Sequence, residues 1–456
     1  MSKSYFKYLY QSKKILWNFL TLVFFAISFT PVLSDMEDGV LRLKTIVTVA
    51  LSLSLILCFV LPAILFSVYQ RRRSSDQYFA LPLNRRTILV STIGFAWFFV
   101  LMNWLGVTVL AHILMNAGFL QKWPLLILYM ALAIGVLLLV NSLVFLVANN
   151  VFDGIIMTIA YFFIFFIVLF LEKSFTSSII AGQGDWGVGW LGEVYLLFSP
   201  VMMIINDYLR VFMTMGSIYD FYPAWFTISL LVMYGLVALI GLRRYFICRS
   251  SENAELVSND PMAYPLIIHV YLGGLMFALA FQYWKMERFL IVLSLLLLLL
   301  AYVIAMFVYR RKIALSRNNV IVFVLTMAIG FGFAFMGMHT KGFGLANQYQ
   351  LKVGETLIYE INNDDYRTRN IHIRIPTHEF SKYQEVIDMM EKYRKEEINQ
   401  YYQLNSDKKV YGYLRVRNDT KTDKFANLYR YAMHRTLNEK EIEILKKYPS
   451  IVEFEK

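Results

Sequence analysis

Residues 71–98 read RRRSSDQYFALPLNRRTILVSTIGFAWF, in which five arginines stand ahead of a long apolar run. Another apolar run, at residues 45–69, ends just before the first of these arginines. A helix that spans a membrane needs about 20 predominantly apolar residues, and both runs reach that length. The stretch is therefore predicted to be a short polar connection between two membrane spans.

The same alternation continues through the 456 residues, of which 58% are hydrophobic and only 17% are charged. Such a composition lies outside the usual range of soluble proteins. The candidate spans cover residues 15–33, 45–69, 87–113, 124–148, 152–171, 225–242, 263–283, 288–308 and 319–338. We predict a polytopic α-helical membrane protein, with about nine transmembrane helices in a 6+3 arrangement plus a small C-terminal α+β domain.

The charge of the connecting loops predicts the orientation of these spans. Of the net charge of +12, a surplus of ten positive charges lies in residues 1–344, because residues 345–456 hold 20 basic against 18 acidic residues. Bases gather at the N-terminus and in residues 70–86, 243–262 and 309–318, which alternate with base-poor loops. Since base-rich loops stay in the cytoplasm, we expect the N-terminus inside and the C-terminal domain outside. The surplus therefore indicates membrane orientation rather than nucleic-acid binding.

The N-terminus is predicted to lie on the membrane surface before the first span. Tyr5, Phe6 and Leu9 alternate with basic residues such as Lys3 and Lys7, which is typical of a helix at the cytoplasmic lipid–water boundary. The following apolar run is longer than the core of a signal peptide, and no A-x-A site follows it. We therefore expect an uncleaved first span.

One further apolar segment, VYLLFSPVMMIINDYLRVFM at residues 194–213, could be mistaken for a tenth span. Ionisable residues on both sides leave an apolar core of only about a dozen residues, which is too short to cross a bilayer. A tenth span would also place Arg243 and Arg244 outside, against the positive-inside trend. We expect an outside-facing amphipathic or re-entrant helix instead.

The C-terminal region contains patterns of both strands and helices. NIHIRIP, residues 370–376, alternates apolar and polar residues and predicts a half-buried strand. Residues 379–400 have helical spacing with many oppositely charged pairs. Residues 409–417 and 424–433 flank a turn-rich connection, so we expect a hairpin.

Near the end of the chain, residues 436–449 are predicted to contain a helix that stops before Pro449. Thr436 and Glu439 have the spacing of a capping box, in which the two residues satisfy each other's main-chain N–H groups. Together these elements predict a compact α+β domain.

No catalytic or metal-binding pattern is found in the sequence. It contains no G-x-x-x-x-G-K-[ST] phosphate loop, no H-E-x-x-H and no G-x-S-x-G. The six histidines are not spaced as metal ligands, and the two cysteines, Cys58 and Cys248, are too few for a disulfide framework or a metal site. Few ionisable residues lie within the spans, which disfavours ion-coupled transport. We expect no metal and no cofactor on this chain, and an energy source elsewhere.

The polar connection between the second and third spans has its own local pattern. Ser74 or Ser75 can cap a short helix, which Pro82 would limit. Asn84 can then start the next helix. Charge alone leaves two interpretations open, a plain base-rich loop or a segment that meets a partner protein.

This connection resembles the corresponding loop in permease subunits of type-2 ABC exporters, where an aromatic residue, a Leu-Pro pair and a basic pair precede the third span. In that family the loop is the coupling helix, which docks on a separate ATPase. The resemblance implies an ATPase-coupling segment at residues 74–86, whose Tyr78, Phe79 and Leu81 would offer apolar side chains to the partner. The implied site residues are Asp76, Tyr78, Phe79, Leu81, Pro82, Arg85 and Arg86.

A second stretch, LLFSPVMMIINDYLRVF at residues 196–212, is similar to the Ser-Pro-containing outer helix between the fifth and sixth spans of that family. The residues of interest in this outer helix are Ser199, Pro200, Asp207 and Arg210. The resemblance covers about residues 1–245. The last three spans and the tail look like the extended permeases of some Firmicutes operons linked with envelope stress and antimicrobial-peptide resistance.

The resemblance implies a division into residues 1–245, 246–343 and 344–456, which are a six-span permease core, three additional spans and an extracytoplasmic domain. It implies the permease subunit of an ATP-driven exporter in the bacterial plasma membrane, which handles an amphiphilic envelope-active compound such as an antimicrobial peptide or a lipid. ATP and Mg would be bound by cytoplasmic ATPase subunits, and a second copy or a sister permease would complete the channel within membrane lipid. The alternative is a membrane-anchored sensor whose tail binds a ligand or envelope component.

Overall fold

The computed structural model describes residues 2–33, 39–79, 83–115, 123–181, 198–212, 224–249, 252, 254–256, 258, 260–310, 317–345, 356–363, 370–402, 412–419, 429–433 and 437–455. Within these residues, nine helices are long and apolar enough to cross a membrane. They are Lys14–Val32, Gly39–Gln70, Arg85–Met115, Trp123–Val147, Val151–Ile179, Trp225–Ile247, Tyr264–Gln282, Arg288–Arg310 and Arg317–His339. Each overlaps one predicted span, so the chain is a multi-pass helical membrane protein as predicted.

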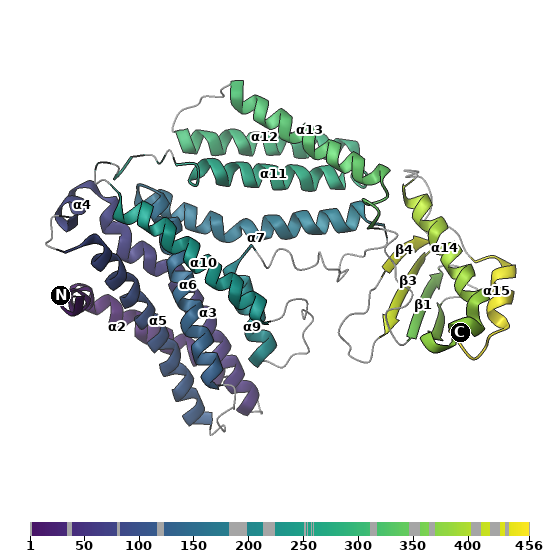
Figure 1. The fold of residues 1–456 in the computed structure, drawn as a ribbon, viewed down its shortest axis with the longest axis horizontal. Coiled ribbons are helices and arrows are strands. Elements are labelled where there is room, and N and C mark those ends of the chain that lie inside the picture. Colours follow the sequence, from purple (N-terminus) through teal and green to yellow (C-terminus); the bar gives the residue numbers. More distant parts are fainter. Residues whose placement is uncertain are drawn as a thin grey trace. The chain divides into compact units, whose positions relative to one another are not determined.

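Figure 1 labels most of the helices and strands in the order of the chain. The helices are α1 (Ser2–Ser12), α2 (Lys14–Ser28), α3 (Gly39–Phe66), α4 (Arg72–Phe79), α5 (Arg85–Met115), α6 (Trp123–Val147), α7 (Val151–Ile179), α9 (Pro200–Phe212), α10 (Ala224–Leu242), α11 (Tyr264–Gln282), α12 (Arg288–Arg310), α13 (Arg317–His339), α14 (Gln384–Tyr402) and α15 (Glu439–Lys446). A 3₁₀ turn, Ser67–Gln70, follows α3, and a π-helical turn, Arg243–Ile247, follows α10.

Contacts divide the chain into two compact units. The first comprises residues 1–164 and 196–268, and the second comprises residues 165–195 and 269–456. The helices α7 and α11 contribute residues to both units. The predicted limits at residues 245 and 343 group the spans in another way and stay predictions.

The core of the first unit is a bundle of apolar helices. The helix α3 packs against α5 and α6, and α10 packs against α6. The side-chain amide of Asn141 in α6 donates to the carbonyl oxygen of Cys58 in α3 over 3.0 Å. Such polar contacts supplement van der Waals packing between helices that lipid surrounds.

The N-terminal segment forms the predicted separate helix, α1. Its Tyr5 is buried, and the ring of Phe6 makes edge contacts with Phe95 and Phe98 in α5, with ring centroids 5.2 Å and 6.1 Å apart. The apolar face of α1 therefore packs on the third span. Its location at a membrane surface stays a prediction.

The fifth span, α7, is longer than the predicted run of residues 152–171 and ends at Ile179. The additional residues include Glu172 and Thr176, which are buried, and the Thr176 hydroxyl donates to the Glu172 carbonyl over 2.9 Å. The helix starts with a cap, since the Asn150 side chain accepts the main-chain N–H of Asp153 over 2.8 Å. Polar residues at both ends therefore continue or cap this helix.

The C-terminal region is the predicted α+β domain. Among the described residues, five antiparallel strands form a sheet in the order β4-β3-β1-β2-β5. These strands are β1 (Thr356–Asn363), β2 (Asn370–Pro376), β3 (Gly412–Asp419), β4 (Tyr429–Met433) and β5 (Val452–Glu455). The predicted half-buried strand is β2, and the predicted hairpin is β3 with β4.

One face of this sheet forms a core with α14, which Figure 1 shows beside the strands. Tyr359 and Ile361 on β1 stand opposite Ile373 and Ile371 on β2, and all four are buried. The capping box of the last helix is shifted by two residues from the prediction. Because α15 begins at Glu439, the box joins Asn438 and Glu441 rather than Thr436 and Glu439.

The tail is fastened to the last turn of α7 within the second unit. The hydroxyl of Tyr402 donates to the carbonyl oxygen of Ile179 over 2.7 Å, and it accepts the N–H of Ala181 over 2.9 Å. The hydroxyl of Tyr401 donates to the carbonyl oxygen of Ser178 over 2.9 Å. The last carbonyls of a helix have no partner within it, so α14 satisfies groups that α7 leaves open.

Candidate functional site

The segment that the sequence singled out begins with α4, an eight-residue helix between the second and third spans. It starts at Arg72, so the predicted start at Ser74 or Ser75 is wrong. The main-chain N–H of Arg72 lies 3.3 Å from the carboxylate oxygen Oε1 of Glu255. A carboxylate from a distant loop therefore takes the place that a local serine was expected to take at the start of this helix.

The two faces of α4 have different surroundings. Arg73, Asp76 and Gln77 are exposed, and their spacing of three and four residues places them on one face. Ser74 and Tyr78, four residues apart, share another face and are half-buried. One side of α4 is thus held by the protein, while the other is open.

The half-buried face is held through Tyr78. Its hydroxyl lies 3.2 Å from the hydroxyl of Tyr8 in α1, and its ring packs edge-on against Tyr69 with centroids 5.4 Å apart. Burial and the hydrogen bond with Tyr8 raise the pKa of Tyr78, so its hydroxyl stays neutral. Tyr78 therefore faces its own chain. The side chain of Phe79, and Leu81 and Pro82 as a whole, lie outside the described residues.

The two arginines at the start of α5 have different roles in the structure. Asn84 caps this helix as predicted, since its side-chain oxygen accepts the N–H of Arg86 over 3.1 Å. The guanidinium of Arg85 donates to the carbonyl oxygens of Ile247 over 3.2 Å and Arg249 over 2.5 Å. Arg86 is exposed. Arg85 thus joins the start of the third span to the residues that follow the sixth.

Those residues belong to a connecting segment, residues 248–262, which in turn caps the end of α6. The guanidinium of Arg249 donates to the carbonyl oxygens of Leu146 over 3.3 Å and Ala148 over 3.4 Å. The hydroxyl of Ser258 donates to the carbonyl oxygen of Val147 over 2.9 Å. Burial lowers the pKa of the Arg249 guanidinium to about 10, so its positive charge remains at neutral pH beside the negative end of the α6 dipole.

The same helix end is also capped from the second span. The side-chain amide of Gln70 donates to the carbonyl oxygens of Phe145 over 2.7 Å and Ala148 over 3.1 Å. Carbonyls at a helix end cost free energy when they are buried without a donor. Three distant side chains therefore fix the end of α6 relative to α3 and the connecting segment.

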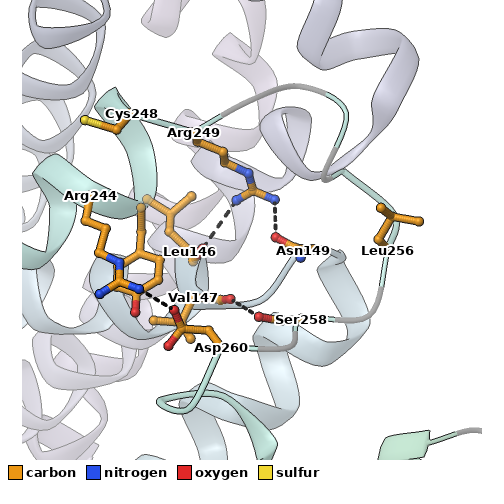
Figure 2. A pocket seen from close by; sticks show the side chains of 10 residues that line it. Leu146, Val147, Asn149, Arg244, Cys248, Arg249, Leu256, Ser258 and Asp260 are labelled. Atoms are coloured by element: carbon orange, nitrogen blue, oxygen red, sulfur yellow. Dashed lines mark hydrogen bonds and ion pairs between the residues drawn. The ribbon is translucent and has the colours of Figure 1, made fainter.

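A pocket of about 360 Å³ lies between the connecting segment and the ends of α6 and α10. Figure 2 shows Arg249 directed at Leu146 and Asn149, and Arg244 directed at Asp260. The ion pair between Arg244 and Asp260 is 3.2 Å long. Both arginines of the pocket are thus engaged by groups of the chain itself, and we interpret the lining as the contacts that fasten the connecting segment.

The second predicted site, the outer helix, is α9, and its thirteen residues are not among the candidate spans. The Ser-Pro pair marks its first turn. The hydroxyl oxygen of Ser199 accepts the N–H of Met202 over 3.3 Å, and Pro200 is the first helical residue. Serine is favoured before a helix because its hydroxyl oxygen accepts a main-chain N–H of the first turn. Proline is favoured at the first helical position because it lacks the N–H that would otherwise need a partner.

The helix α9 lies alongside the spans rather than beyond their ends. The hydroxyl of Tyr129 in α6 donates to the carboxylate of Asp207 over 3.0 Å, and the hydroxyls of Tyr208 and Thr48 lie 3.2 Å apart. Thr48 is roughly 13 Å along α3 from its first residue. Asp207 thus holds α9 against the bundle. The side chain of Arg210 lies outside the described residues.

The helix-capping contacts of Gln70, Glu255, Arg249 and Ser258 were not predicted from the sequence. Each of these polar residues lies at a span end or in a loop, where charge patterning indicates solvent or lipid headgroups. Among the described residues, no group of three or more His, Cys, Asp or Glu side chains could hold a metal ion. The site is therefore a set of helix caps and exposed charges.

We compared the chain with protein-family models, with curated protein sequences and with solved structures, and none of the three comparisons gave a match. The sequence and the structure together show a multi-pass membrane protein, with nine candidate spans among its described residues.

Proposed function

We propose that this chain is the permease subunit of an ATP-driven, type-2 ABC exporter in a bacterial plasma membrane, and that α4 is the helix on which a separate ATPase docks. The observation that supports this most strongly is the contrast between the two faces of α4. Arg73, Asp76 and Gln77 are exposed, whereas Tyr78 is fixed to Tyr8 and Tyr69. A docking helix needs an open surface for its partner and a firm attachment to the spans that it moves.

The attachment of α4 also suits the transmission of a movement. On one side the 3₁₀ turn Ser67–Gln70 joins it to α3, and Gln70 caps α6. On the other side Arg85, at the start of α5, is bonded to the residues after α10. A displacement of α4 would therefore reach four spans of the first unit through covalent continuity or hydrogen bonds.

In the proposed mechanism, two permeases pair, either as two copies or with a sister chain, and two ATPases close on ATP in the cytoplasm. The closing displaces α4 and shifts the spans between inward-open and outward-open states. The shift is limited by the differential free energy that ATP binding supplies to the two states. The exported compound is proposed to be amphiphilic and active on the cell envelope, such as an antimicrobial peptide or a lipid.

The test is purification of the tagged chain in mild detergent from the bacterium that produces it, followed by assay of Mg-dependent, vanadate-sensitive ATP hydrolysis. We expect an ATPase to accompany the chain in fixed proportion and to be lost from Arg73→Glu. The matched control is Lys395→Glu, which reverses the same charge on an exposed position of α14. An ATPase that is absent from the wild-type preparation, or that binds Arg73→Glu as well as the control, would contradict the proposal.

A further inference from the structure

The connecting segment contains a residue in a backbone conformation that side chains other than glycine rarely adopt. Glu255 has a φ of 67°. This left-handed conformation costs a non-glycine residue free energy, and it persists only where the surrounding contacts impose it. The N–H of Glu255 donates to the carbonyl oxygen of Asn149, in the turn between α6 and α7, over 2.8 Å. The main chain is thus held on the α6–α7 turn while the side chain points elsewhere.

The side chain of Glu255 reaches the first residue of α4. Its carboxylate accepts the N–H of Arg72 over 3.3 Å, and the guanidinium of Arg72 lies 3.4 Å from the carbonyl oxygen of Glu252. The first N–H groups of a helix have no partner within it, and a negative charge there also interacts favourably with the helix dipole. Glu255 and Glu252, three positions apart in the connecting segment, therefore hold the main chain and the side chain of Arg72.

The contact between Glu255 and α4 involves the segment that joins the sixth span to the last three spans. The connecting segment follows the sixth span and leads directly into α11, the first of the last three spans. Ser258 and Arg249 fasten it to the end of α6, and the hydroxyl of Tyr264 in α11 donates to the carboxylate of Asp153 in α7 over 2.7 Å. The segment is consequently fixed at several points on both sides of Glu255.

We propose that Glu255 is a positioning residue that sets the place of α4. Through this carboxylate, the segment that leads to the additional spans determines where the coupling helix stands. This inference rests on the proposed function of α4, since positioning matters only if a partner acts there. It implies that movements of the connecting segment regulate coupling without altering the exposed face that the ATPase meets.

The contact can be tested without any partner, by hydrogen exchange of the detergent-purified full chain. We expect Glu255→Met, which keeps the length of the side chain but lacks the carboxylate oxygens, to raise amide exchange across Arg72–Phe79 roughly fivefold, the effect typical of losing one helix cap. Glu252→Met is the matched control. It removes the same charge from the same segment but retains the carbonyl that meets Arg72, so its exchange should stay at the wild-type level.

A second variant separates the carboxylate from the backbone conformation. Glu255→Gly adopts a positive φ without strain but has no carboxylate, so we expect it to raise exchange in α4 as Glu255→Met does. Wild-type exchange in both variants would overturn the proposal. A rise in Glu255→Met alone, or an equal rise in Glu252→Met, would also overturn it, because the cause would then be the new apolar side chain or the lost charge.

The role in coupling is measured on the complex with the ATPase. We expect Glu255→Met to retain the wild-type amount of bound ATPase, because Arg73, Asp76 and Gln77 are untouched, while permease-dependent ATP hydrolysis falls roughly fivefold. Unchanged hydrolysis would contradict positioning. Loss of bound ATPase would contradict a role separate from docking. If no ATPase accompanies the wild-type chain, the proposed function fails, and the exchange experiment still decides whether Glu255 holds α4.

Discussion

The guanidinium atom Nη1 of Arg85 lies 2.5 Å from the carbonyl oxygen of Arg249, so the first residue of the third span is hydrogen-bonded to the main chain just after the sixth. Arg249 uses its own guanidinium to cap α6 through the carbonyls of Leu146 and Ala148. The two arginines therefore connect three helix ends in series. Arg86, which follows Arg85 in the sequence, is exposed. The hydrogen bonds of Arg85 can therefore be tested by comparing the same substitution at these two positions.

Arg85→Met removes the donor and retains an apolar stem, which leaves the carbonyls of Ile247 and Arg249 without this partner. We expect the free energy of unfolding to fall by about 1–3 kcal/mol, the typical cost of an unsatisfied buried group. Arg86→Met, the matched control, should change it by less than about 0.5 kcal/mol, as is usual for exposed positions. Thermal unfolding in detergent measures both. Equal changes in the free energy of unfolding for the two variants would show that Arg85 is a surface charge like Arg86.

Gly154→Ala tests the packing around Gln70 at the end of α6. A methyl group on Gly154 would stand 2.8 Å from ring atoms of Phe145 and 3.1 Å from Nε2 of Gln70. We expect a loss of about 1–3 kcal/mol in the free energy of unfolding, as for other overpacked sites. Gly94→Ala is the control, since no neighbouring atom lies within 4 Å of the added carbon. The control should be neutral or more stable, and a comparable loss there would refute the role of local crowding.

The buried hydroxyl of Tyr401 leads us to predict how the stability of the tail changes as the pH becomes alkaline. Burial raises the pKa of this hydroxyl above its ordinary value of about 10. Below about pH 10 the Tyr401 hydroxyl is neutral in both the folded and the unfolded chain, so its contribution to the free energy of unfolding is fully present. As the pH rises further, the unfolded chain releases the proton first, so the free energy of unfolding falls. Tyr401→Phe should have a shallower decline in thermal stability between about pH 8 and about pH 11. An identical decline in both proteins would exclude this group as a contributor.

The orientation can be tested with the natural cysteines. Cys248 is exposed in the connecting segment, and Cys58 is buried. If the base-rich loops are cytoplasmic, a membrane-impermeant maleimide should label Cys248 only after spheroplasts are permeabilised. A cysteine introduced by Lys395→Cys in the tail should react in intact spheroplasts. Labelling of Cys248 in intact spheroplasts would reverse the orientation.

Much of the fold could be predicted because a bilayer imposes a length and an apolar composition on each span. The nine spans, the short α9 and the cap at Asn84 all follow from such local rules. The end of α7 was predicted too early, at residue 171, and the residues that extend this helix include Glu172, which is buried within the second unit.

The contacts at the candidate site could not be predicted in this way. The start of α4 depends on a carboxylate that is 183 positions away in sequence, and no local serine indicates it. Gln70 and Arg249 likewise bond to main-chain carbonyls, which have the same chemistry at every residue and leave no signature in a sequence. Only the tertiary arrangement brings such donors to the helix ends that need them.

The most direct test of the central claim is site-specific photo-crosslinking in living cells from an unnatural amino acid placed at Gln77, on the exposed face of α4. A matched probe at Lys395, on α14 in the tail, reports non-specific capture. We predict a covalent adduct between position 77 and an ATPase chain, identified by mass spectrometry, and no such adduct from position 395. Crosslinks from position 77 only to lipid or to this chain itself, in the bacterium that naturally produces the chain, would contradict the assignment of α4 as the ATPase-docking helix.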